Sequence, residues 1–299
     1  MKKAVSVLMA LCLVFGLTGC GPVDYFTARQ HMKNGEYAPA AAGFAALGDW
    51  LDSTERYREA RYQQALALEA DGAAEEACAY FEELGNYEDC AVRVRKLRDE
   101  LFRLHVQGTW LSQELELAPV CRDMMADALA QAGLEALLPF WTLDSLPLRM
   151  GLMVQEGKDA ALLPERDSQN AALALLTESL SEALYRCSQS AYEAVAEENG
   201  MTWEALIAYY QVESLDELFL LDRGCTPAEY LESILPQDAL RPLLEVLNCT
   251  GDWDTGEDLL LLRQDGGTLG LLYDDGSDTF TLADPLSGYG LDMVFERLS

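Results

Sequence analysis

The ten residues FAALGDWLDS (Phe44–Ser53) return 37 positions later as FEELGNYEDC (Phe81–Cys90). In both copies a glycine follows a leucine, and an aspartate comes soon after an aromatic residue. Glycine commonly ends a helix, and aspartate commonly begins one because its side chain can cap free backbone N–H groups. The repeat therefore predicts a helix that ends at Leu47, a turn at Gly48-Asp49-Trp50 and a new helix from Asp52. We expect Asp52 to cap that helix and Trp50 to lie between the repeated units.

The same period links small, glycine and aromatic residues upstream: Ala28, Gly35, Ala40 and Phe44 return as Ala65, Gly72, Ala77 and Phe81. Small residues let paired helices approach closely, the glycine breaks the chain between them, and the phenylalanine fills the gap to the next pair. These offsets resemble the tetratricopeptide repeat, a family of antiparallel helix pairs. The resemblance implies two pairs in residues 20–104, closed by a helix over Glu88–Leu104. The period is longer than the family's usual length of about 34 residues, so the repeat is a variant.

The first twenty residues resemble the signal sequence of bacterial lipoproteins. A basic start at Lys2-Lys3 precedes an apolar run of 14 residues, Ala4–Leu17, which is too short to span a bilayer. Leu17-Thr18-Gly19-Cys20 then resembles the lipobox of that family. The resemblance implies that residues 1–19 are removed and that Cys20 carries a diacylglyceryl group and further acyl chains such as palmitate. We therefore expect a protein held on the extracytoplasmic face of the cell membrane by its N-terminal lipid.

The charge of the chain is strongly negative and unevenly placed. The net charge is −30 overall; residues 20–104 hold 10 basic and 16 acidic residues, and residues 105–299 hold 9 and 35. Such an acidic surface repels nucleic-acid phosphates, so we expect no nucleic-acid partner. With only two histidines and no Cys-x-x-Cys motif, the sequence predicts no metal site and no cofactor. Asp252–Asp258 departs from the spacing of a calcium loop and is interpreted as a structural turn.

Residues 107–299 alternate between strand-like and helix-like patterns. Strands are predicted at the period-two segments 109–117, 146–155, 258–263, 268–273, 278–283 and 291–297. A helix is predicted over 119–133, and a long helical insertion occupies about residues 165–248, where Thr226 with Glu229 matches a capping box. The fold class is therefore α+β: helical hairpins followed by an antiparallel sheet or barrel with a helical insertion.

Gly108-Thr109-Trp110 and the closing segment with Thr279-Phe280-Thr281-Leu282 resemble lipocalin-like domains of lipoproteins. The resemblance covers residues 107–163 and 249–299. It implies a β-barrel in which Trp110 is a core residue that closes the base of the barrel. It also implies an alternative function, since lipocalins carry small apolar ligands inside the barrel.

The sequence holds no nucleophile elbow, phosphate loop or zinc-protease motif. We therefore expect no catalytic residues and a lipid-anchored protein that binds or scaffolds an envelope protein or peptide. A carrier of a small apolar ligand is the alternative, and an envelope hydrolase is a weaker one. The two halves are expected to join near His105–Gly108, with residues 107–299 as a separate domain.

Overall fold

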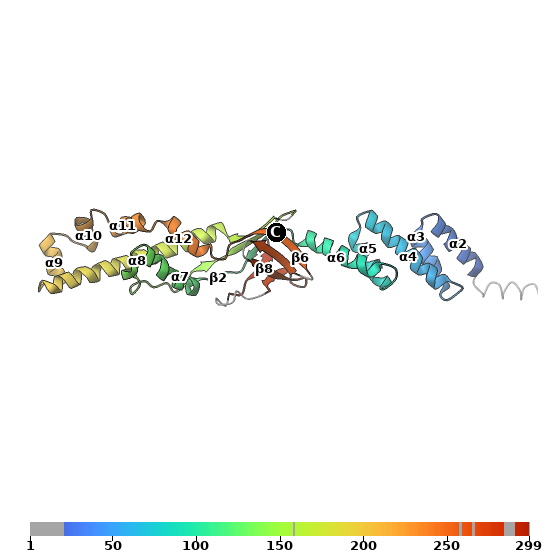
Figure 1. Cartoon of the computed structure of the whole chain (residues 1–299), viewed down its shortest axis with the longest axis horizontal. Helices are drawn as coiled ribbons and strands as arrows, with labels where there is room; N and C mark the ends of the chain where they lie inside the picture. Colours follow the sequence, from blue (N-terminus) through green and yellow to red (C-terminus); the bar gives the residue numbers. More distant parts are fainter. Residues whose placement is uncertain (1–20, 158, 257–258, 265–266, 284–290, 299) are drawn as a thin grey trace, which may run out of the picture. The chain divides into compact units, whose positions relative to one another are not determined.

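A computed structural model describes residues 21–157, 159–256, 259–264, 267–283 and 291–298 (Figure 1). The chain divides into two compact units, residues 1–105 and residues 106–299. We call them the helical unit and the β unit. Cys20, the predicted site of lipidation, lies outside the described residues.

The helical unit consists of consecutive helices that pair as the repeat predicts. The first pair is α2 (Gly21–Lys33) and α3 (Tyr37–Leu47), and the second pair is α4 (Ser53–Ala70) and α5 (Ala74–Leu84). The closing helix is α6 (Cys90–Val106). Within each pair the turn contains a glycine with a left-handed backbone, Gly35 at φ +79° and Gly72 at φ +81°, a conformation that glycine adopts without steric cost. The expected helical hairpins are confirmed.

The repeated positions form the core of the helical unit. Ala28, Ala40 and Phe44 pack in one buried cluster together with Ala60 of the next helix. Their counterparts in the second pair pack in a second cluster: Ala65, Ala77 and Phe81, together with Cys78, Cys90 and Leu97. Each pair therefore buries its aromatic residue against the helix that follows it.

The β unit contains a closed antiparallel barrel of eight strands, consistent with a lipocalin-like architecture. The strands are β1 (Gly108–Ser112), β4 (Met150–Val154), β5 (Asp159–Pro164), β6 (Cys249–Gly256), β7 (Leu259–Gln264), β8 (Gly267–Asp274), β9 (Thr279–Leu282) and β10 (Val294–Arg297). Neighbours in the barrel follow the chain, and β1 closes it by pairing with both β4 and β10.

Two of these strands were not predicted from the sequence. The interpretation of Asp252–Asp258 as a turn is wrong over its described part, because residues 249–256 form β6. Trp253 points inward and is buried, and it pairs with Leu262. Asp252 and Asp254 take the alternate positions. The strand was not recognised in the sequence because acidic residues alternate with Trp253. Such residues are compatible with a barrel strand, since alternate side chains point outward to solvent.

Two insertions interrupt the barrel. Between β1 and β4 lie β2 (Leu115–Glu116), α7 (Ala118–Gln131), the 3-10 helix η1 (Glu135–Leu137) and β3 (Pro147–Leu148). Between β5 and β6 lie α8 (Arg166–Glu198), α9 (Trp203–Tyr210), α10 (Leu215–Arg223), α11 (Pro227–Ile234) and α12 (Gln237–Leu244). The predicted strand 109–117 is thus divided into β1 and β2, and only β1 belongs to the barrel.

The second insertion forms an elongated helical arm (Figure 1). Helix α8 has 33 residues, which corresponds to about 50 Å at 1.5 Å per residue. The carboxylate of Glu165 caps its start by accepting hydrogen bonds from the backbone N–H groups of Asp167 and Ser168. The shorter helices contact α8 as the chain returns to the barrel. The predicted capping box of Thr226 and Glu229 begins α11.

Candidate functional site

The repeat carries a hydrogen-bonded triad that the sequence reasoning missed. In the first pair the Tyr25 hydroxyl donates to Asp52 at 2.5 Å, and the Arg56 guanidinium donates to the same carboxylate at 3.1 Å. Asp52 was expected to cap α4, but its carboxylate makes no capping hydrogen bond there. It links α2 to α4 instead. The hydrogen bond from Tyr25 and the pairing with Arg56 lower the pKa of Asp52. The same arrangement recurs 37 residues later in Tyr62, Asp89 and Arg93.

An aromatic cluster accompanies each triad. The ring centroid of Tyr25 lies 5.8 Å from that of Phe44 and 5.3 Å from that of Trp50. The Trp50 ring also lies 3.5 Å from where a Cβ would stand on Gly21. Trp50 was expected between the units, and the structure places it against the beginning of α2. Its turn is therefore close to the first described residue of the chain.

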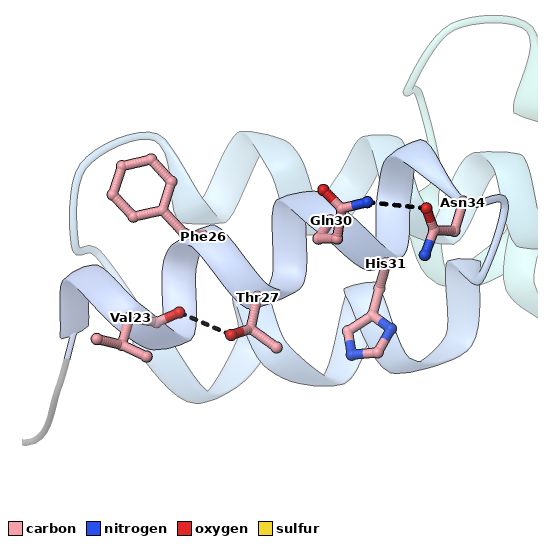
Figure 2. Close-up of a pocket in the computed structure, with 6 residues that line it drawn as sticks. All are labelled: Val23, Phe26, Thr27, Gln30, His31 and Asn34. Carbon is pink, nitrogen blue, oxygen red and sulfur yellow. Dashed lines mark hydrogen bonds between the residues drawn. The ribbon is translucent and has the colours of Figure 1, made fainter.

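The surface of α2 that points away from α3 forms a shallow depression (Figure 2). Its volume is about 410 Å³, and its lining consists of Val23, Phe26, Thr27, Gln30, His31 and Asn34. We call these six residues the α2 outer face. The side chains of Gln30 and Asn34 are joined by a 2.9 Å hydrogen bond, and Val23 and Phe26 are exposed. The face is therefore apolar near the start of α2 and polar towards its end.

Trp110 of β1 is fully buried. Its indole N–H donates to the Val106 carbonyl at 3.0 Å, and its ring meets that of Phe280 edge-on at 4.6 Å. The guanidinium carbon of Arg297 lies 4.1 Å from the ring centroid. Arg297 also donates to Asp278 at 3.2 Å. Trp110 thus connects β1 to β9 and β10, which come from the far end of the chain.

The described interior of the barrel is occupied by side chains. Eight inward residues have no accessible surface: Trp110, Met150, Leu152, Leu260, Leu262, Leu271, Phe280 and Phe295. A side chain without accessible surface borders no space that a water molecule could enter. An eight-stranded barrel has an interior that either is filled by side chains or holds one small ligand, and the described side chains here fill it. The packing of these residues therefore gives no support to the carrier alternative.

The remaining reactive groups do not form a recognisable centre within the described part of the chain. All six cysteines described are free thiols, and burial raises the pKa of Cys121 to about 11, which keeps it protonated and weakly nucleophilic. No group of three or more His, Cys, Asp or Glu residues among the described ones could hold a metal ion. None of the described helices is both long and apolar enough to cross a membrane.

The far end of the helical arm exposes apolar side chains. We call residues 193–223 the arm tip. Tyr209 and Leu221 are the two most exposed large apolar residues described in the β unit, at 70% and 61%. Tyr210, Leu220 and Val195 are also exposed. The tip contains eight acidic residues and one basic residue, Arg223.

A small core supports the arm tip from within. Ala196 of α8, Leu206 of α9 and Leu218 of α10 are buried together. The tip is therefore a packed structure that keeps a second set of apolar side chains in the solvent.

Comparisons of the chain with protein-family models, with curated proteins and with solved structures gave no match.

Proposed function

We propose that this chain is a lipid-anchored, extracytoplasmic binding or scaffolding protein that presents the helical arm to a protein partner. The lipobox ending in Cys20 supplies the anchor, and the variant tetratricopeptide pairs serve as a spacer after it. The lipocalin-like barrel serves as a base for the arm. No catalytic step is part of this proposal.

The observation that carries the proposal is the distribution of apolar side chains in the β unit. The inward side chains of the barrel are buried against one another, whereas the side chains of Tyr209 and Leu221 are exposed at the arm tip. Contiguous exposed apolar patches mark protein interaction sites, and tyrosine is enriched at the energetic centres of interfaces. The surplus of seven negative charges at the tip favours a partner with lysine and arginine beside an apolar surface.

The anchoring half of the proposal is tested with Cys20→Ser. The variant should appear in the medium or remain as an uncleaved precursor, because the thiol that accepts the lipid is gone. Fractionation with immunodetection measures this outcome. A variant that stays in the membrane at its mature size would contradict lipid anchoring.

The binding half is tested by placing a photo-crosslinking amino acid at position 209 of the anchored protein. A discrete crosslinked envelope protein is expected, and Leu221→Ser should reduce its yield. Leu175→Ser is the matched control, since Leu175 is exposed on α8 outside the tip. Equal yields in both variants would contradict a site at the tip. Native mass spectrometry with a reproducible bound lipid would favour the carrier, and turnover of peptidoglycan or glycans would favour a hydrolase.

A further inference from the structure

The α2 outer face lies on the first described helix of the helical repeat. The residues that occupy the Val23 position one and two periods later are Ala60 of α4 and Leu97 of α6. Both are buried, Ala60 completely, in the cores that join each pair to the next helix. Val23 is 61% exposed. The helical repeat therefore buries this position wherever a preceding pair exists, and α2 has no described pair before it.

The same comparison identifies residues that are apolar only in the first repeat. Phe26 is 65% exposed, and its counterparts are Gln63 in α4 and Glu100 in α6. Leu51 is 68% exposed, and its counterpart is Glu88. The positions equivalent to Phe26 and Leu51 are therefore polar in the repeats that lie farther from the N-terminus.

The backbone conformation at Leu51 does not explain why this position is a leucine in the first repeat and a glutamate in the second. Leu51 and Glu88 both have a left-handed backbone, with φ of +53° and +46°. That conformation is unfavourable for any residue with a Cβ, and a leucine there gains no compensation from burial in the helical unit. Neither local conformation nor the core of the unit explains an exposed leucine at this turn.

These apolar residues gather beside Gly21, the residue that follows Cys20. Trp50 packs on Gly21 and Tyr25, which brings the Trp50-Leu51 turn to the start of α2. Val23 and Phe26 lie in the first two turns of α2, about 3 and 8 Å along the helix from Gly21 at 1.5 Å per residue. The later positions of the α2 outer face are polar. A seam for a second helix would be apolar along its whole length, whereas a surface that touches a bilayer end-on is apolar only near the lipid.

We propose that Val23, Phe26, Trp50 and Leu51 insert into the interfacial region of the lipid bilayer next to the acylated Cys20. This inference rests on the proposed lipid anchoring. Residues 21–56 hold five acidic and three basic residues, so attraction to anionic headgroups does not drive the contact. Burial of apolar side chains at the boundary between headgroups and acyl chains drives it.

The test uses the lipidated full-length protein in phosphatidylcholine vesicles, which carry no net charge. Hydrogen exchange of residues 21–34 and 48–52 is compared between the wild type and the double variant Phe26→Gln with Leu51→Glu. Vesicle flotation and intact mass confirm that both proteins carry the lipid. Gln63→Ala with Glu88→Ala is the matched control at the equivalent positions of the second pair.

Exchange in both segments should be about tenfold slower for the wild type and the control than for the double variant on vesicles. A wild type that floats with its lipid but exchanges as fast as the double variant would overturn the inference and leave the anchoring intact. A wild type whose mass lacks the lipid would overturn the anchoring instead. Concentration-dependent protection of unlipidated Cys20→Ser in vesicle-free solution would overturn the inference in favour of a second copy on the α2 outer face.

Discussion

Trp110→Ala should destabilise the barrel far more than any other part of the molecule. The indole has no accessible surface, and its removal leaves the Val106 carbonyl without its donor and Arg297 and Phe280 without the ring between them. Truncation of a fully buried tryptophan costs about 3–5 kcal/mol of unfolding free energy. At 1.4 kcal/mol per factor of ten, barrel opening should become about two to four orders of magnitude more frequent.

Hydrogen exchange measured by NMR or mass spectrometry resolves this change by position. The slowest amides of β1, β9 and β10 should lose about two to four orders of magnitude of protection in Trp110→Ala. Trp110→Phe should lie between that variant and the wild type, because it keeps an aromatic ring but not the indole N–H. Trp50→Ala is the control, since Trp50 is partly exposed in the helical unit. Barrel amides in Trp110→Ala that keep their protection within about threefold would refute the role assigned to this residue.

Three further changes test individual contacts. Tyr25→Phe removes the hydrogen bond that does most to lower the pKa of Asp52, so carbon-13 NMR titration should show that pKa rise towards its ordinary value, and an unchanged titration would contradict the triad. Gly43→Ala should lower the denaturation midpoint of the helical unit although alanine favours helices by about 1 kcal/mol, because the new Cβ would stand 2.9 Å from Ala28 Cβ; a raised midpoint would contradict the close approach. Burial opposes the ionised Glu116, but hydrogen bonds from Ser145, Leu146 and Ala118 outweigh it and lower its pKa. Since the folded-state pKa is the lower one, the contribution is present above about pH 4.3 and disappears as the pH falls through the folded value. Urea denaturation should therefore show Glu116→Gln less stable than the wild type at pH 7, and the difference should become smaller as the pH falls below about 4.3.

The sequence predicted what is encoded locally. The helical pairs follow from residues within one period, and the strands nearest the chain's end follow from short alternating runs with turns between them. Strands β5 and β6 were missed because their pairing is distant: Leu162 pairs with Cys249 across the whole helical insertion. Acidic residues on the outer side of β6 also resemble the composition of a loop.

The candidate surfaces were missed for a different reason. Nothing in the pattern around Phe26 or Leu51 distinguishes an exposed apolar residue from a buried one. Tyr25 and Tyr62 could have been found, since they recur at the same period as the alanines that were used. The repeat period gives Phe26 and Leu51 polar counterparts, and this difference became informative only when the structure showed that both residues are exposed.

The geometry of the β unit limits where a partner can bind with specificity. A barrel whose inward side chains are closely packed can act as a rigid support, because close-packed protein interiors resist deformation. Helix α8 extends that support, and its start is fixed by the Glu165 cap at the edge of the barrel. The returning helices hold it along its length through buried residues such as Leu176, Leu240 and Leu244. Tyr209 and Leu221 therefore stand on a packed structure, so the proposed partner would meet a backbone whose position is largely set before binding, which reduces the entropic cost of association.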